Sequence, residues 1–573
     1  MKKTSIVFIS LLLALSLLAG CAAPDFATSF VVTDTQHTLR DEFDSFDELE
    51  YVRPDFEKIQ NTMYELFDAL KSPFKLRQIS TLLDEFYAQC SDFETMYVIA
   101  NIRSSKDMTD EFYAEEYSWL MSSYGQLQYM IEQVYMACAE SIHIFWLEPL
   151  RFWEGFREEY QAVDGEEDSI SLRYGELVAR ETEIISEYRS FVSTQTVEVA
   201  GQELSFDEYL LQLPPYAHAE AYEKHYRENN AVLGQMYVEL IEIHQEMAEL
   251  MGYESYAAME YEQGFGRDYG PEQVEEYMEH VKRHLAPLGI KLAEQGLSSS
   301  AGYRAVSSRE LLLWLDTAAA GFGGIIEEAY KYMLAHKLYD MEYSPNKMNS
   351  SFQTYLADYD APYLFIDPAG DNWDIITVFH EFGHYANAYI RYNAPESMDL
   401  SESFSQAMEF LALGKLDCIL NAEELEQMHS MALMDITSSL LDQTALAEFE
   451  LRACEMEQPT VEKLNELWLQ LTKDYGMYDE IFGNIYQYSW TETPHLFESP
   501  FYVISYPVSA AVALELYELE LEEEGAGIEK FVEMSQSCLA GLVETVEFAS
   551  LQYPLSEERV MDMAEFLERL LIK

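Results

Sequence analysis

Apolar residues recur at three- and four-residue spacing along most of this chain, which is the period of one face of an α-helix. The pattern is clear from Pro54 to about Ser193, in runs such as FEKIQNTMYELFDALK and YGQLQYMIEQVYMACAESIHIFW. It resumes from about His218 to Gln295 and from Arg309 to Lys337. These segments predict a mainly α-helical protein, and the sequence contains no internal repeat or low-complexity block.

Two short stretches depart from the helical period. TVEVAGQELS alternates around Ala200-Gly201 and predicts a short β-hairpin. Within residues 350–367, SSFQTYLA and APYLFID have the composition of strands and predict a small β element directly before a further helix. Because an exposed strand can pair with the backbone of an extended peptide, we expect APYLFID to contact a peptide ligand in this way.

The N-terminus, MKKTSIVFISLLLALSLLAGC, predicts a secretory signal. Its apolar stretch from Ile6 to Leu18 follows two lysines and is too short for a convincing transmembrane helix. The ending Leu-Ala-Gly-Cys resembles the lipobox of bacterial lipoproteins. We therefore expect residues 1–20 to be a lipoprotein signal peptide and Cys21 to carry the lipid. The predicted location is extracytoplasmic, on the bacterial cell membrane, with the lipid as the only anchor.

The pattern after Cys21 divides the rest of the chain into three parts. A polar segment rich in Thr and Asp, residues 21–45, predicts a tether. Residues 46–204 predict an N-terminal helical lobe, and residues 205–573 form a second and larger unit. At 573 residues and 49% hydrophobic content, the chain is long enough to bury a large core.

The charge balance is strongly acidic. Asp and Glu number 103 against 35 Lys and Arg, which gives a formal net charge of −68. Nucleic acid is excluded as a partner, because its phosphates require clustered Lys and Arg. Electrostatic docking on anionic lipid is disfavoured for the same reason. The charge is compatible with attraction of basic peptides, and equally with a well-solvated surface.

The segment from Asp371 to Tyr392 contains the motif HEFGH. Its composition predicts a helix with Asp371 as the N-cap. His380 and His384 then lie one turn apart on the same face, so both imidazoles can reach one metal ion. Glu381 lies beside them, where it can take a proton from a water on that ion. By contrast HVKRH, residues 280–284, places cations between its histidines and predicts only a solvated helix face.

A catalytic zinc site needs a third protein ligand and an open fourth position. The next helix, DLSESFSQAMEFLALGKL, beginning near Asp399 or Ser401, offers Glu402 and Glu409, which are seven residues apart on one face. Spacing alone does not choose between them. The cysteines other than Cys21 are far apart, and none lies near this motif, so a structural thiolate site is disfavoured and buried thiols are expected. They are Cys90, Cys138, Cys418, Cys454 and Cys538.

HEFGH followed by E-x-x-S-Q-x-x-E, ending at Glu409, resembles the thimet oligopeptidase and oligoendopeptidase F family of zinc metallopeptidases. The resemblance implies one zinc ion per chain, held by His380, His384 and Glu409. It gives Glu402 a supporting role, orienting a ligand histidine.

A later stretch, HLFESPFYVISYPVS, resembles the family segment whose histidine and tyrosines line the active-site cleft. The resemblance assigns His495 and Tyr506 to this role, with Tyr502 as a further candidate. The side chains of Tyr506 and His495 can donate hydrogen bonds to an oxyanion.

The resemblance also implies the architecture and the reaction. It implies a two-lobed, mainly helical metallopeptidase with a deep channel and a small β element beside the zinc helix, and residues 205–573 become the catalytic domain. The expected reaction is hydrolysis of internal bonds in short unstructured oligopeptides, with Glu381 as the general base.

Two other functions stay open. A dipeptidyl carboxypeptidase can share this scaffold, and the sequence does not separate internal from terminal cleavage. A non-catalytic peptide-binding lipoprotein has no need of HExxH, so the motif argues against it. The sequence does not indicate an oligomeric state.

Overall fold

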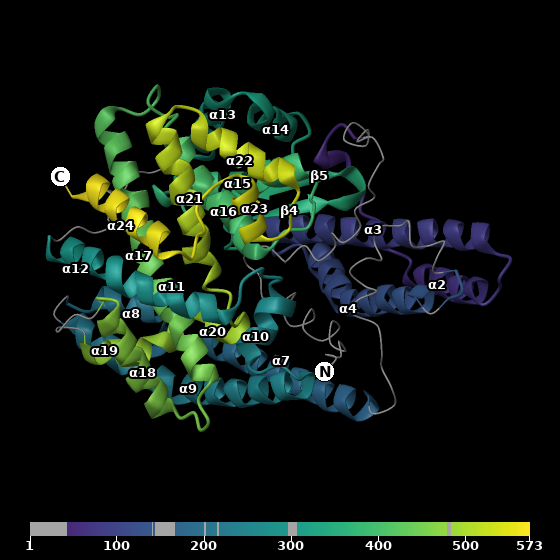
Figure 1. The fold of residues 1–573 in the computed structure, drawn as a ribbon, viewed down its shortest axis with the longest axis horizontal. Helices are drawn as coiled ribbons and strands as arrows, with labels where there is room; N and C mark the ends of the chain where they lie inside the picture. The colour runs from purple at the N-terminus through teal and green to yellow at the C-terminus, as the bar shows by residue number, and fades with distance from the viewer. Residues whose placement is uncertain are drawn as a thin grey trace.

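The computed structural model of the protein is mostly helical and contains two small β-sheets (Figure 1). The structure describes residues 43–139, 141–143, 167–199, 202–214, 217–295, 306–477 and 483–572. The predicted signal peptide, Cys21 and nearly all of the predicted tether lie outside the described residues. No helix among the described residues combines the length and the apolar character that crossing a bilayer requires.

Three helices near the N-terminus form a unit that extends to one side of the main body (Figure 1). They are α2 (Phe56–Leu70), α3 (Leu76–Lys106) and α4 (Glu111–Ala139), preceded by the short η3 (Phe46–Glu48). Their apolar faces bury residues such as Leu66, Phe86 and Val134 in a core of their own. The predicted helical character of this region is confirmed.

The next helix, α7 (Glu167–Thr194), belongs to the main core instead. Its Ile184 and Tyr188 are buried in the same cluster as residues of α9 (His218–Met251), against which it packs. Between them, β1 (Val197–Val199) and β2 (Gln202–Leu204) pair antiparallel, which confirms the predicted hairpin. The predicted lobe of residues 46–204 therefore does not coincide with one hydrophobic core, because the apolar face of α7 is covered by α9.

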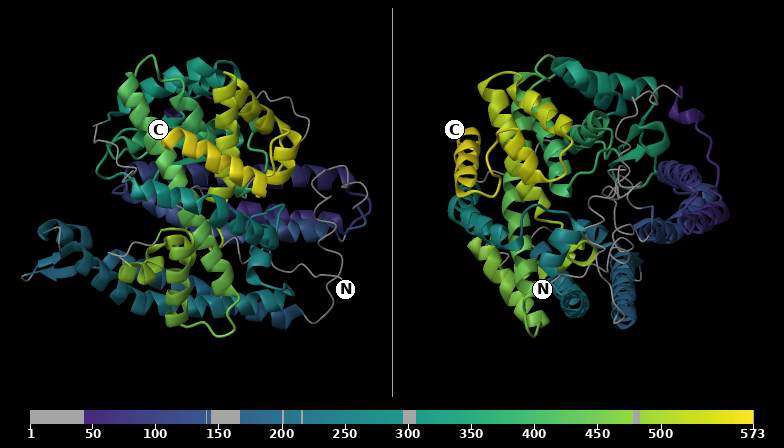
Figure 2. Two further views of the ribbon diagram at one scale, coloured as in Figure 1. Left: turned by 60° about the vertical axis from the view of Figure 1, so that its left-hand side comes forward. Right: turned by 45° about the vertical axis from the view of Figure 1, so that its right-hand side comes forward.

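The remaining helices build the main body, whose upper part in Figures 1 and 2 holds α13 to α16 and α21 to α24. The part below holds α8, α9, α10, α18 and α19. Their bounds are α8 Phe206–Gln212, α10 Tyr256–Met259, the π-helix η6 Glu260–Gly264, α11 Pro271–His284, α12 Ala286–Glu294, α13 Ser308–Phe322, α14 Gly324–Ala335, α15 Trp373–Arg391, α16 Met398–Leu413, α17 Ala422–Cys454, α18 Val461–Asp474, α19 Gly483–Ser489, η8 Trp490–Glu492, α20 Pro494–Glu498, α21 Ser505–Glu522, α22 Ala526–Ser537, α23 Leu542–Phe548 and α24 Glu557–Leu571.

The second sheet has three strands in the order β3-β5-β4. The central strand β5 (Ala361–Phe365) pairs parallel with β3 (Tyr339–Asp340) and antiparallel with β4 (Phe352–Leu356), and η7 (Ala357–Tyr359) connects β4 to β5. The predicted strands are confirmed. The prediction that APYLFID pairs with a peptide is wrong, because this strand is fully buried and flanked on both sides. The edge strands of this sheet are β3 and β4.

Helix α15 carries HEFGH, as predicted, but its N-cap is Asn372 and not Asp371. The Asp374 carboxylate instead accepts hydrogen bonds from the backbone N–H groups of residues 369, 370 and 371. These bonds hold the loop between β5 and α15 over the first turn of the helix. They fix where the helix starts relative to the sheet.

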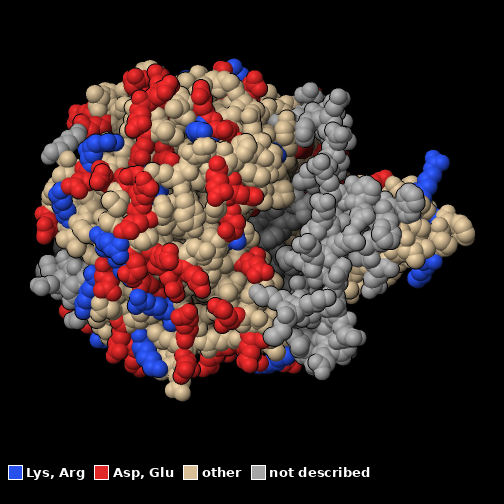
Figure 3. Space-filling view, in the orientation of Figure 1, with Lys and Arg blue, Asp and Glu red and all other residues tan. Residues whose placement is uncertain are grey.

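Acidic side chains dominate the face of the main body seen in Figure 3, with fewer Lys and Arg between them. Part of this charge is paired: in the HVKRH segment of α11, Arg283 and His284 both contact Glu557. Cys90, Cys138 and Cys454 are buried free thiols as expected, whereas Cys418 and Cys538 are exposed.

Candidate metal centre and active site

The site is built where α15 and α16 cross at unusually close range. A Cβ atom at Gly383 would lie 2.6 Å from the carbonyl oxygen of Phe404 and from the Cα of Ser405. The glycine within HEFGH therefore lets the backbone of α16 approach α15 directly. This contact brings the carboxylates of α16 up to the two histidines of α15.

Three side-chain atoms converge at this crossing. Oε2 of Glu402 lies 3.4 Å from Nε2 of His380 and 3.9 Å from Nε2 of His384. Among the described residues these three form the one group of His, Cys, Asp or Glu side chains whose ligand atoms all lie within 4.8 Å of one another. The His380 side chain is 24% exposed, so the group can be reached from solvent.

The other ring nitrogen of each histidine is already engaged. Nδ1 of His380 lies 2.7 Å from Oε1 of Glu409, and Nδ1 of His384 lies 3.1 Å from Oγ of Ser401. With Nδ1–H of His380 donated to Glu409, Nε2 is the ring nitrogen that is left for a metal. Both rings therefore present Nε2 toward Glu402.

The structure places the two glutamates differently from the sequence-based expectation. Glu409 was expected to be the third ligand, yet it lies on the Nδ1 side of His380 and holds that ring. Glu402, expected to be the supporting residue, is the carboxylate that faces both Nε2 atoms. The reason is geometric: seven residues along α16 separate the Cα atoms of the two glutamates by about 10 Å along the axis, so their side chains approach the His380 ring from different sides.

The three residues fit a zinc ion. Two imidazole nitrogens and one carboxylate oxygen are a ligand set used by catalytic zinc, and they leave a fourth position open. Zinc–ligand bonds of about 2.0–2.1 Å in a tetrahedron place ligand atoms roughly 3.3 Å apart, close to the spacing around Glu402. Small rotations of the side chains suffice to bring the three atoms onto one ion.

The protonation states of Glu402 and His384 suit a metal. Burial disfavours a charge on Glu402, but His380, His384 and Tyr502 outweigh this effect and lower its pKa to about 2. Burial lowers the pKa of His384 to about 4. A charged carboxylate and a neutral imidazole are the forms that coordinate a cation. Burial lowers the pKa of His380, but Glu402 and Glu409 outweigh this effect and raise that pKa well above its usual value, so this ring must lose a proton when a metal binds.

Glu381 lies within this cluster and beside the sheet. Burial raises the pKa of its carboxyl group to about 7, and a backbone hydrogen bond from Gln353 of β4 opposes that rise. The edge strand β4 therefore runs past the glutamate of HEFGH. A peptide paired with β4 would be placed next to Glu381.

The three aromatic candidates from the C-terminal segment are brought together on the same site. The rings of His495 and Tyr502 stack at 5.2 Å, and Tyr506 packs edge-on against His495 at 6.1 Å. The hydroxyl of Tyr502 donates a 3.0 Å hydrogen bond to Oε1 of Glu402. Tyr502 is thus tied to a candidate ligand, whereas Tyr506 and His495 are more exposed.

Sequence reasoning missed the contacts that surround these residues. Ser401 sits one position before Glu402 and contacts His384, and Gly383 sets the distance between the helices. The glycine inside a helical pattern was the available signal, since glycine in a helix costs stability unless close packing requires it. No sequence signal points to Ser401.

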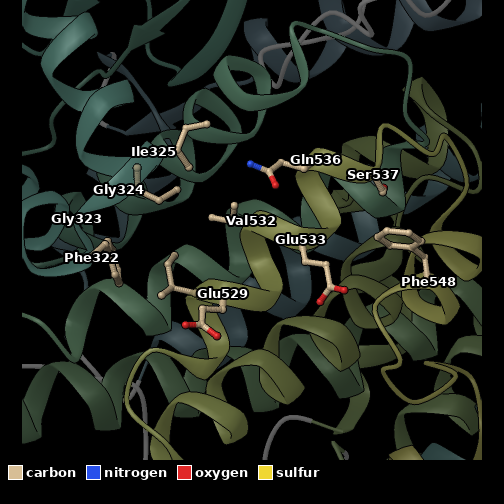
Figure 4. Close-up of a pocket in the computed structure, with 12 residues that line it drawn as sticks. Phe322, Gly323, Gly324, Ile325, Glu529, Val532, Glu533, Gln536, Ser537 and Phe548 are labelled. Atoms are coloured by element: carbon tan, nitrogen blue, oxygen red, sulfur yellow. The ribbon is translucent and has the colours of Figure 1, made fainter.

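A surface cavity of about 560 Å³ lies elsewhere, between the α13–α14 connection and α22 (Figure 4). Its lining is largely apolar, with Ile325, Val532 and Phe548 among its residues and Glu529 and Glu533 at its polar side. It contains none of the candidate catalytic residues, so it is not part of the site.

Two family descriptions match this chain. The peptidase M3 N-terminal domain matches residues 46–148, and peptidase family M3 matches residues 323–531, which include every candidate ligand. Together they cover more than half of the chain. The chain belongs to peptidase family M3. This confirms the predicted family, and the family indicates a metalloendopeptidase, as predicted.

Relatives agree with this assignment. An oligoendopeptidase F homologue of Borreliella burgdorferi is 27% identical over 187 residues, which cover 30% of this chain and 31% of the relative. The chain thus matches about a third of the length of that curated relative. A solved protein assigned as oligoendopeptidase F has a TM-score of 0.73 at 21% identity, over 92% of this chain and 98% of its own. PZ peptidase A, solved with an inhibitor, has a TM-score of 0.74 at 20% identity, over 92% and 99%. The likeness to these structures confirms the fold.

Proposed function

We propose that this protein is a zinc-dependent endopeptidase that hydrolyses internal bonds of short, unstructured oligopeptides. The observation that carries the proposal is the convergence of His380 Nε2, His384 Nε2 and Glu402 Oε2 on one point, with Glu381 in the same cluster. These three residues hold one zinc ion per chain. Glu409 and Ser401 orient the two histidines.

When bound, the zinc ion polarises the scissile carbonyl and lowers the pKa of the attacking water toward neutrality. Glu381 accepts a proton from that water and passes it to the leaving amine. The carbonyl oxygen gains negative charge as the water adds, and Tyr506 and His495 donate hydrogen bonds to it. Tyr502 keeps Glu402 oriented through the bond to Oε1.

Substrate binding follows from the sheet and the charge. An extended peptide adds to the edge strand β4, which gives affinity through the backbone and places few demands on side chains. Only a flexible segment can enter the channel between two lobes that the family resemblance implies, so we expect folded proteins to be excluded. The net charge of −68 speeds the arrival of basic peptides, and added salt reduces this advantage.

Peptides with blocked termini test the mode of cleavage. The enzyme is expected to cut a peptide that carries an N-terminal acetyl and a C-terminal amide group, with both products identified by mass spectrometry. Chelation is expected to abolish cleavage and added zinc to restore it. The alternative, a dipeptidyl carboxypeptidase, requires a free C-terminus and releases dipeptides only from the unblocked peptide. Peptide binding without any cleavage in zinc would favour the binding lipoprotein instead.

The oxyanion donors give a second test. Tyr506→Phe and His495→Ala are each expected to lower kcat by about 10²-fold while KM changes little, because their hydrogen bonds strengthen as charge develops on the carbonyl oxygen. Tyr517→Phe is the matched control, since it removes a hydroxyl that contacts His429 further along the same helix α21. Unchanged kcat in both site variants would mean that Tyr506 and His495 only contribute aromatic packing.

Anchorage remains a proposal that rests on the sequence alone. Cys21 is proposed as the lipidated residue because it follows Leu-Ala-Gly after an apolar signal core. Lipidation there would place the enzyme outside the cytoplasm, attached to the membrane.

A further inference from the structure

Arg267 is a fully buried arginine outside the metal centre. It connects helix α16 to the segment around Phe501, and both of these meet at the metal centre. Nε of Arg267 lies 3.1 Å from Oδ2 of Asp399, in the first turn of α16, and both side chains are 0% exposed. Nη2 of the same guanidinium donates to the carbonyl oxygen of Phe501 and to Oγ of Ser505, each at 2.9 Å. The planar guanidinium of Arg267 therefore connects α16, which carries Glu402, to the segment that carries Tyr502.

Phe501 has an unusual backbone conformation. Its φ is +64°, a left-handed value that non-glycine residues adopt only where their surroundings impose it. Both of its polar backbone groups are held by buried side chains: the N–H donates to Oε1 of Glu450 at 2.8 Å, and the carbonyl accepts from Arg267. The conformation of Phe501 thus depends on Glu450 and Arg267, which hold its N–H and its carbonyl group.

The residue that follows is Tyr502. The hydrogen bonds from Arg267 and to Glu450 therefore also fix the backbone position from which the Tyr502 side chain extends. The Tyr502 hydroxyl reaches Oε1 of Glu402 at 3.0 Å. The guanidinium of Arg267 also lies 4.3 Å from the ring centre of Phe265, whose ring packs against that of Tyr502 at 6.1 Å. Arg267 therefore supports Tyr502 from both its backbone and its ring.

We propose that Arg267 is a positioning residue that holds Tyr502 against the metal-facing carboxylate Glu402. It acts through the left-handed turn at Phe501, with its ion pair to Asp399 anchoring the guanidinium, and it touches neither metal nor substrate. The inference rests on the proposed function, because it assigns Glu402 to the metal. A residue that only stabilises the core would affect the site whether or not the Tyr502 hydroxyl is present. The effect of Arg267 on the site instead passes through that hydroxyl.

A double-mutant cycle on the full chain tests this route. Arg267→Lys keeps a positive charge but lacks the planar guanidinium, and Tyr502→Phe removes only the hydroxyl. The readouts are the zinc dissociation constant, by competition with a chelator, and kcat with KM on a blocked peptide. Each single variant is expected to weaken zinc binding and lower kcat about tenfold, in the range of losses seen for groups that orient metal ligands. KM should stay within about threefold, because these contacts act on the metal centre.

The decisive expectation is non-additivity. In the Tyr502→Phe background, Arg267→Lys should cost less than about threefold further, because its route to Glu402 is already broken. Arg559→Lys is the matched control: that arginine is also buried, donates to the carbonyl of Ala511 and pairs with Glu518 on α21. It should lower the unfolding temperature and add independently to Tyr502→Phe. If Arg267→Lys does not fold, Ser505→Ala removes one partner of the guanidinium and enters the same cycle.

Two results would overturn the proposal: zinc affinity and kcat that are unchanged in a folded Arg267→Lys protein, or effects that simply add to those of Tyr502→Phe. The zinc titration needs no turnover, so it separates this inference from the proposed function. A protein that binds zinc and shows the non-additive loss of affinity, but cleaves no peptide, would contradict only the peptidase assignment.

Discussion

Replacing Glu381 by Gln is expected to lower kcat by on the order of 10²- to 10⁴-fold while one zinc ion per chain remains bound. Glutamine fills the same volume and keeps an acceptor oxygen, but it cannot take up the proton of the attacking water. The metal should remain because the two Nε2 atoms and the Glu402 carboxylate are untouched. Metal analysis of the purified variant, together with steady-state kinetics on a blocked peptide, measures both quantities.

The control for this exchange is Glu448→Gln on α17. Glu448 is also buried, but it pairs with Lys282 and Tyr475, away from HEFGH. Its replacement should reduce stability and leave turnover near that of the parent. Near-native turnover in Glu381→Gln would mean that another group takes the proton. Loss of zinc from that variant would make its low activity uninformative about the base.

The helices and the histidine pair were predictable because they depend on local sequence. A helix needs only its own period of apolar residues, and His380 and His384 face the same side of α15 wherever that helix packs. The hairpin at β1 and β2 was predictable for the same reason, since alternation and a glycine mark it. The period of a helix or hairpin can be read directly from the chain, but the first residue of α15 could not, because its N-cap is Asn372 and not Asp371.

Strand order and the division of the core depend on packing between separate segments. Nothing in APYLFID indicates whether it lies at the edge of a sheet or at its centre, yet two residues of β3 pair with it and bury it. Likewise, the apolar face of α7 was visible in the sequence, but not that α9 would cover it. What a segment packs against or pairs with was therefore not readable from its own pattern, even where the partner lies within about 25 residues.

The supporting contacts of the site show the same dependence. Arg267 lies 132 positions before its partner Asp399, and 234 before Phe501, so no spacing rule connects them. Tyr502 was predicted to line the cleft from family resemblance, but its bond to Glu402 requires the positions of α16 and of the loop before α21. The resemblance named the segment, and the structure shows the contact between Tyr502 and Glu402.

The choice between Glu402 and Glu409 is the point at which sequence and structure disagree most directly, and metal binding decides it. Glu402→Ala is expected to abolish stoichiometric zinc binding, because it removes the one carboxylate among the described residues that faces both Nε2 atoms. Glu409→Ala should keep the ion but weaken its affinity by on the order of 10- to 100-fold, since it removes the acceptor that fixes the ring of His380. Chelator competition measures both affinities.

Glutamine at the same two positions sharpens the comparison. Glu409→Gln retains an oxygen that can accept the Nδ1–H of His380, so it should recover much of the affinity lost in Glu409→Ala. Glu402→Gln should recover little, because a neutral amide is a poor substitute for a charged ligand of zinc. The opposite ranking, with zinc lost from the Glu409 variants and kept in those of Glu402, would restore Glu409 as the third ligand. It would require the side chains of α16 to exchange places when the ion binds, against the close contact that Gly383 maintains between the two helices.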